Sequence, residues 1–180
     1  MPSATVTATA AEIERAIRNV PDFPKAGIQF KDITPVLADG RLFTGAIDLL
    51  TERFQPGMVD AVVGIDARGF IFAAAAAAKL KTGFIPVRKK GKLPHQTIEQ
   101  DYALEYGSAT VAMHVDALKP GERVLLIDDL LATGGTSAAA AALVQKLGGR
   151  ILEIGFLIEL KFLNGRDKLK DWPVRSVITY

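Results

Sequence analysis

Four short, almost uninterrupted apolar runs constrain the fold of this chain more than any other feature. They lie at 61–65, 83–87, 124–127 and 151–158, and the segments 70–80 and 136–147 between them have the composition of helices. Strands buried on both faces give continuous apolar runs, and their alternation with helices is typical of parallel sheets. We therefore predict an α/β fold, with a parallel sheet flanked by helices on both faces.

The N-terminal part of the chain shows helical spacing in two places. Apolar residues within 13–20 follow Thr9, which can cap a helix, and those within 42–54 form a second amphipathic stripe. Between them, 23–40 mixes Pro and Gly with isolated hydrophobic residues, which predicts irregular structure. We expect a small N-terminal lobe, or hood, over residues 1–35.

Residues 102–114 depart from the pattern of the apolar runs. Two stretches of alternating polarity flank Gly107 and Ser108, which predicts an antiparallel hairpin. We expect the segment 88–107 to form a lid loop that leads into this hairpin. No internal repeat or linker interrupts the chain, so one domain over residues 1–180 is predicted.

Composition excludes several classes of chemistry. Cysteine is absent, so disulfides, thiolate metal sites and a cysteine nucleophile are excluded. With only two histidines, a metal ion must be held by oxygen ligands or arrive with a substrate, and Mg²⁺ is the natural candidate. A formal charge of +2 gives no indication of nucleic-acid binding.

The longest apolar run, residues 70–78, is far shorter than the roughly 20 residues that a membrane span needs. The first ten residues lack the charged start and apolar stretch of a secretory signal. We therefore expect no membrane segment and a cytoplasmic location.

The richest chemistry lies where the apolar run 124–127 passes into the predicted helix 136–147. The polar and small residues of this junction are Asp128, Asp129, Ala132, Thr133, Gly134, Gly135 and Thr136. Ligands of open α/β sheets bind beyond the carboxyl ends of strands, where helix N-termini attract anions. The two glycines allow the backbone to close around a phosphate, and the threonines add hydroxyl donors. The two carboxylates would repel that phosphate, so we expect them to accept hydrogen bonds from sugar hydroxyls.

A simple strand-to-helix turn with aspartates as caps is the alternative interpretation of this junction. The segment lacks the lysine of a P-loop and the G-x-G-x-x-G spacing of a dinucleotide site, which argues against nucleotide triphosphate hydrolysis and NAD binding. A ribose phosphate is the ligand that the junction predicts.

Two further groups of basic residues follow apolar runs. Arg68 comes directly after 61–65 and could bind a diphosphate or pair with Asp66. The basic cluster 88–92 could be a solvated surface or a lid over a diphosphate. Contact with nucleic acid is a third alternative, and the lack of aromatic residues in the cluster argues against it.

The thirteen residues 124–136 resemble the phosphoribosyl pyrophosphate (PRPP) signature of the type I phosphoribosyltransferases. The segments 23–33, 66–69, 88–94 and 104–107 are similar to the adenine branch of that family, although Ala26 stands where many relatives have proline. The resemblance implies the type I fold and the reaction of adenine with PRPP to give AMP and pyrophosphate. It also implies Mg²⁺ bound to the substrate and a homodimer.

The same resemblance implies roles for individual residues. The signature residues would bind the ribose and phosphate of PRPP or AMP. The diphosphate would be bound by Asp66, Arg68, Arg88, Lys89 and Lys92, and adenine by Gln29, Lys31 and Leu130. Arg68 and Glu105 would be the catalytic residues, with Glu105 assisting proton transfer at the purine. Alternation within the hairpin alone would instead make Glu105 a solvent-facing residue.

Two other functions compete with adenine transfer. A phosphoribosyltransferase for hypoxanthine, xanthine or orotate would share the phosphate motif and differ in the N-terminal lobe. A non-catalytic PRPP-sensing regulator would carry a DNA-binding domain, and the 22 residues before Phe23 are fewer than such a domain needs. We therefore expect an enzyme.

Overall fold

The computed structural model describes residues 7–103 and 107–180, and the chain forms two compact units, Met1–Leu49 and Leu50–Tyr180. The single domain predicted for the whole chain stays a prediction. Among the helices that the structure describes, none is long and apolar enough to cross a membrane.

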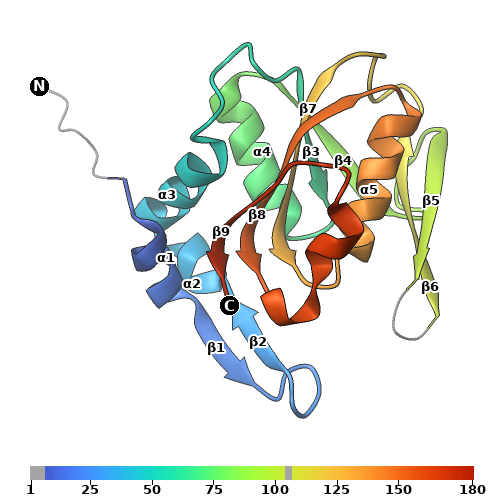
Figure 1. The fold of residues 1–180 in the computed structure, drawn as a ribbon. Helices are drawn as coiled ribbons and strands as arrows, with labels where there is room; N and C mark the ends of the chain where they lie inside the picture. The colour runs from blue at the N-terminus through green and yellow to red at the C-terminus, as the bar shows by residue number, and fades with distance from the viewer. Residues whose placement is uncertain (1–6, 104–106) are drawn as a thin grey trace, which may run out of the picture. The chain divides into compact units, whose positions relative to one another are not determined.

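The N-terminal unit combines short helices with a two-stranded sheet (Figure 1). Its elements are α1 (Ala10–Ala16), β1 (Arg18–Pro21), β2 (Gln29–Asp32), α2 (Thr34–Ala38) and the greater part of α3 (Gly40–Thr51). Thr9 caps α1 as predicted, because its side chain accepts from the Glu12 N–H while the Glu12 carboxylate accepts from the Thr9 N–H.

Two predictions for this unit were wrong. The helix expected over 13–20 ends at Ala16, because Arg18–Pro21 pairs antiparallel with Gln29–Asp32. The region expected to be irregular contains both β2 and α2. The hydrogen bonds of β1 and β2 join residues on either side of an intervening loop, and the spacing of apolar residues within either segment does not reveal them.

The larger unit is built on a seven-stranded sheet of order β5-β6-β4-β3-β7-β8-β9. Its strands are β3 (Ala61–Ile65), β4 (Gly83–Lys89), β5 (Thr97–Ala103), β6 (Ser108–His114), β7 (Arg123–Leu131), β8 (Arg150–Glu159) and β9 (Val174–Thr179). The five neighbouring strands β4, β3, β7, β8 and β9 run parallel. At the β4 edge, β6 pairs antiparallel with β4, and β5 pairs antiparallel with β6. The predicted strands and hairpin are thereby confirmed.

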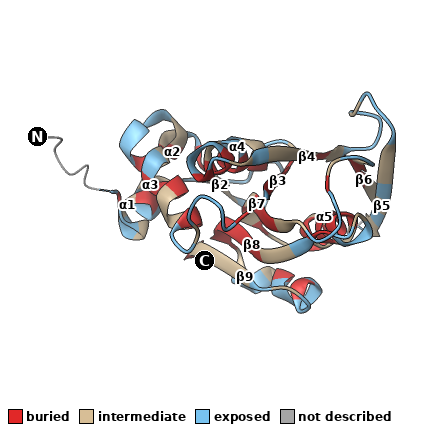
Figure 2. Cartoon of the chain, turned by 90° about the horizontal axis from the view of Figure 1, so that it is seen from above, coloured by how far each residue is buried: buried red, intermediate tan, exposed pale blue. Residues whose placement is uncertain are grey.

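Helices α4 (Gly69–Leu80) and α5 (Gly135–Lys146) cover opposite faces of this sheet. A Cβ on Gly64 would lie 2.6 Å from the Cβ of Ala73 in α4, so even-numbered residues of β3 face α4. The odd-numbered residues of β3 share a buried cluster with Leu143 and Val144 of α5. Figure 2 shows α4, α5 and the central strands as the most buried part of this unit. The predicted α/β class is confirmed.

Several strands extend further than their apolar runs. Because β7 continues to Leu131, both Asp128 and Asp129 lie inside the strand, and because β4 continues to Lys89, Arg88 also lies in a strand. The hairpin begins at Thr97, which pairs with His114. The C-terminal elements η1 (Lys161–Leu163), η2 (Gly165–Leu169) and β9 were not predicted.

Candidate functional site

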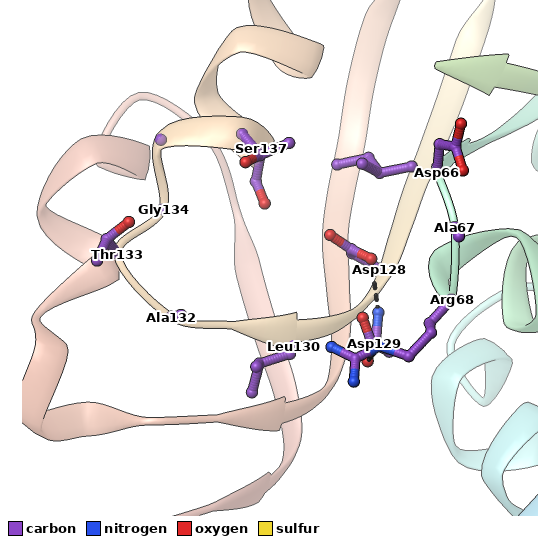
Figure 3. A pocket seen from close by; sticks show the side chains of 13 residues that line it. Asp66, Ala67, Arg68, Asp128, Asp129, Leu130, Ala132, Thr133, Gly134 and Ser137 are labelled. Atoms are coloured by element: carbon purple, nitrogen blue, oxygen red, sulfur yellow. Dashed lines mark hydrogen bonds and ion pairs between the residues drawn. The ribbon is translucent and has the colours of Figure 1, made fainter. Parts of the chain in front are cut away.

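A cavity of about 280 Å³ opens at the carboxyl ends of the neighbouring parallel strands β3 and β7 (Figure 3). Its lining comprises the turn after β3, the end of β7 and the start of α5. The lining residues are Ile65, Asp66, Ala67, Arg68, Asp128, Asp129, Leu130, Ala132, Thr133, Gly134, Gly135, Thr136 and Ser137. The structure thus brings Asp66 and Arg68 together with every residue predicted at the 128–136 junction.

Backbone groups dominate the α5 side of the cavity. Gly134 is the N-cap of α5 with a φ of 76°, a conformation that favours glycine, and its carbonyl accepts from the Ala138 N–H. The first N–H groups of a helix lack intrahelical partners, and among the described residues no side chain caps α5. The start of α5 is therefore suited to an anion, with the hydroxyls of Thr133, Thr136 and Ser137 beside it.

Two adjacent carboxylates dominate the β7 side. Asp129 is only 6% exposed, and its Oδ2 lies 2.8 Å from Nε of Arg68. The Asp129 N–H donates to Oδ1 of Asp128 at 2.9 Å. A Cβ on Gly69 would lie 2.5 Å from the same Oδ1, so glycine at the start of α4 makes room for the Asp128 carboxyl.

Burial raises the pKa of both carboxyls, and each has a second influence. The negative charge of Asp129 raises the pKa of Asp128 further, whereas the Arg68 guanidinium opposes the rise in the pKa of Asp129. The charged form of the pair is therefore disfavoured in the free protein, and a ligand that carries or develops positive charge would stabilise it.

The turn after β3 forms a second ion pair at the cavity. Asp66 Oδ2 lies 2.9 Å from Nε of Arg88, and Nη1 of Arg88 donates to the Lys92 carbonyl at 2.9 Å. The peptide bond between Asp66 and Ala67 is cis. Arg68, for which pairing with Asp66 was an alternative, forms its ion pair with Asp129. The two ion pairs thus bring Asp66, Arg68 and Asp129 to the cavity lining, whereas Arg88 lies outside that lining.

The remaining predicted site residues fall into three groups. Lys89 and Lys92 are exposed, near the end of β4 and in the turn after it, and neither lines the cavity. Gln29 and Lys31 lie on β2 of the N-terminal unit. Glu105 lies outside the described residues.

Two residues of the site were missed from the sequence. Ser137 is buried and lines the cavity from the first turn of α5, a place that the helix start at Gly135 would have indicated. Gly69 contributes only the space for Asp128, which no local pattern indicates.

Comparisons with known proteins agree with this geometry. Residues 34–178 match the family model described as a phosphoribosyl transferase domain. The chain belongs to the phosphoribosyltransferase family. It is 53% identical over 172 residues to an adenine phosphoribosyltransferase of Chloroflexus aurantiacus, and the match covers 96% of this chain and 99% of that protein.

Solved structures of the family show the same fold. The crystal structure of adenine phosphoribosyltransferase from Rhodothermus marinus superposes with a TM-score of 0.90 at 51% identity, covering 95% of this chain and 98% of that one. The Saccharomyces cerevisiae enzyme, in complex with adenine and an imino-altritol bisphosphate, superposes with a TM-score of 0.88 at 41% identity, covering 93% and 97%. The predicted type I fold is thereby confirmed.

Proposed function

We propose that this chain transfers the phosphoribosyl group of PRPP to adenine, giving AMP and pyrophosphate. The observation that carries the proposal is one cavity in which a helix start suited to an anion faces two adjacent carboxylates and Arg68. Relatives about half identical over nearly their whole length are adenine phosphoribosyltransferases, which supports adenine as the acceptor.

The helix start would hold the 5′-phosphate. In this proposal the N–H groups at the beginning of α5 donate to the phosphate oxygens, together with the hydroxyls of Thr133 and Thr136. Ala132 and Gly135 add no side-chain donor and let the ligand approach the backbone. The same contacts would hold PRPP and AMP, because both carry the 5′-phosphate.

The carboxylate pair would act on the ribose. When the bond from the anomeric carbon to the diphosphate breaks, positive charge develops on the ribose and negative charge on the leaving group. Asp128 and Asp129 would accept hydrogen bonds from the ribose hydroxyls and stabilise that positive charge. A bound diphosphate would compete with Asp129 for the Arg68 guanidinium, leaving the carboxylate to face the ribose.

The diphosphate would lie toward the turn after β3. Arg68 would bind it with its fork of donors, and Arg88, Lys89 and Lys92 would add charge from β4 and its following turn. Mg²⁺ would arrive with PRPP and neutralise part of the diphosphate charge. Asp66 would lie at the diphosphate as well, in its ion pair with Arg88.

The acceptor side of the reaction rests on family resemblance. Glu105 would take the imidazole proton of adenine while another ring nitrogen attacks the anomeric carbon. Leu130, which lines the cavity, would contact the base, and backbone groups near Gln29 and Lys31 would bind its exocyclic amine. A lid role for 88–107, a homodimer and a cytoplasmic location are further proposals from the same resemblance.

A turnover assay across bases tests the proposed function. Purified protein is incubated with PRPP, Mg²⁺ and adenine, hypoxanthine, xanthine or orotate in turn, and nucleotide and pyrophosphate are measured together. Adenine should give AMP and pyrophosphate in equal amounts at the highest kcat/KM. A preference for another base would move the chain to a different branch, and PRPP binding without turnover would indicate a regulator.

A further inference from the structure

The loop from β7 to α5, residues 132–134, lies directly against a second loop that the proposed reaction does not use. A Cβ on Gly134 would overlap the carbonyl oxygen of Gly165, the first residue of η2. A Cβ on Gly165 would in turn overlap the carbonyl oxygen of Ala132 and lie 2.9 Å from Cδ1 of Leu131. The two backbones are therefore in contact, with no side chain between them, and the position of η2 limits where the β7–α5 loop can lie.

Arg166, the next residue along the chain, fixes η2 to the sheet. Its Nε and Nη2 donate to the two carboxylate oxygens of Glu159 at 2.7 and 2.8 Å. Its Nη1 donates to the carbonyl of Val174 at 3.0 Å, and Nη2 also reaches Oγ of Ser176 at 3.3 Å. One guanidinium thus joins η2 to the end of β8 and to β9. Such fork-to-carboxylate pairs fix geometry as well as charge.

The carboxylate of Glu159 requires hydrogen-bond partners such as Arg166. It is only 3% exposed, and a buried carboxylate is costly unless its oxygens are paired. The hydrogen bonds of Arg166 hold the pKa of Glu159 below its ordinary value. The next residue, Leu160, donates its N–H to the Leu131 carbonyl at 2.9 Å, immediately before the β7–α5 loop. The end of β8 therefore contacts the residue before this loop through Leu160, while Glu159 holds η2 through Arg166.

Arg166 does not itself line the cavity of the site. It lies with Glu159, Lys161, Asn164 and Asp167 around a different cavity of about 290 Å³. An effect of Arg166 on ligand binding is therefore indirect, and the direct contacts of Gly165 with Ala132 and Gly134 offer a route for it.

We propose that Arg166, held by Glu159, is a positioning residue that fixes the β7–α5 loop for the 5′-phosphate. The inference rests on the proposed function of that loop. Loss of the guanidinium would free η2 from the sheet, and the β7–α5 loop would lose the backbone against which it packs. Affinity for the phosphate would then fall although every residue that touches it is unchanged.

The chain offers a matched control at the opposite end of β7. Arg123, the first residue of that strand, donates from Nε and Nη2 to the two carboxylate oxygens of Asp60 at 2.9 and 2.8 Å. Nη2 also donates to the carbonyl of Gly57 at 2.7 Å. This pair has the same fork geometry and a backbone acceptor as well, but Asp60 is more exposed than Glu159, and neither Arg123 nor Asp60 lines the cavity.

The experiment compares Arg166→Ala with Arg123→Ala in two measurements. The first is the ratio of the adenosine Kd to the AMP Kd, which isolates the 5′-phosphate. Because the loop would keep its donors and lose only their fixed position, we expect about a tenfold fall in this ratio for Arg166→Ala, which corresponds to about 1.4 kcal/mol. For Arg123→Ala, the ratio of the adenosine Kd to the AMP Kd should stay within about twofold of its value in the unmodified protein, well below a tenfold change.

The second measurement is amide hydrogen exchange of residues 132–137 in ligand-free protein. It does not depend on the reaction, so it separates failure of this inference from failure of the proposed function. Exchange should accelerate in Arg166→Ala and stay unchanged in Arg123→Ala. Arg166→Lys, which keeps the charge and loses the fork, should lie between, and it replaces Arg166→Ala should that variant not fold.

Two results would overturn the positioning role. One is an unchanged ratio of the adenosine Kd to the AMP Kd in a folded Arg166 variant. The other is hydrogen exchange at 132–137 that is equally slow in the Arg166 and Arg123 variants. If the unmodified protein itself does not bind AMP more tightly than adenosine, the proposed phosphate site fails, and the exchange result still decides whether Arg166 fixes the loop.

Discussion

Replacing Gly134 with alanine tests whether backbone geometry at the start of α5 holds the 5′-phosphate. Gly134 has a φ of 76°, and an added Cβ would overlap the Gly165 carbonyl oxygen. Gly121 provides the control, because it has a φ of 86° and no atom within 4 Å of an added Cβ. Both variants place alanine in the left-handed region, and only Gly134→Ala also meets a neighbouring backbone.

The expected magnitudes follow from these two contributions. A left-handed conformation costs a non-glycine residue about 1–2 kcal/mol, which is the whole loss expected for Gly121→Ala. Overpacking adds about 1–3 kcal/mol for Gly134→Ala. For a chain of this size 1 kcal/mol corresponds to about 2–4 °C, so Gly134→Ala should melt about 2–12 °C below Gly121→Ala.

Thermal unfolding and AMP binding are measured on both variants. The β7–α5 loop could relieve the overlap by moving, and then part of the loss would appear as weaker AMP binding with adenosine binding unchanged. Equal melting temperatures for the two variants together with unchanged AMP affinity in Gly134→Ala would refute the reasoning.

Four further substitutions test the site. Asp128→Asn removes a carboxyl whose pKa is raised in the folded state, so the variant should melt at a higher temperature than the unmodified protein at neutral pH. This difference in melting temperature should vanish as the pH falls below about 4, where the aspartate is protonated in the folded and the unfolded chain alike. Asp129→Asn should lower kcat more than it raises KM in steady-state assays, because it removes charge that stabilises the ribose cation. Thr136→Val should weaken AMP and PRPP binding by on the order of 1–3 kcal/mol in calorimetry, and an affinity unchanged from that of the unmodified protein for both ligands would contradict a hydroxyl contact. Glu105→Gln should slow single-turnover AMP formation by about 10²–10⁴ with PRPP affinity nearly constant, whereas a rate within about threefold of the unmodified protein would remove Glu105 from the chemistry.

Local sequence was sufficient where burial alone decides the structure. The run 61–65 is buried at every position, and its apolar character predicts β3 to the residue. The 124–136 junction combines a strand end, two carboxylates and a glycine-rich helix start, so it predicts most of the cavity lining. These features lie next to one another in the chain.

The failures share a dependence on partners that are distant in sequence. Strand β1 has mostly exposed positions and becomes a strand only through pairing with β2. The Arg68–Asp129 ion pair joins the turn after β3 to the end of β7, and the spacing of these residues along the chain does not indicate it. Likewise, Gly165 has a role only because Ala132 and Gly134 approach it in space.

The adjacent carboxylates at the end of β7 have a consequence for how this protein can change under selection. Burial and mutual repulsion make Asp128 unfavourable for the folded chain, so its presence reflects selection for ligand binding and catalysis against selection for stability. A library screened only for survival of heating should therefore enrich neutral residues at position 128 and lose activity as it does so. The same library screened with a 5′-phosphate ligand and turnover should retain the aspartate and collect its stabilising changes elsewhere.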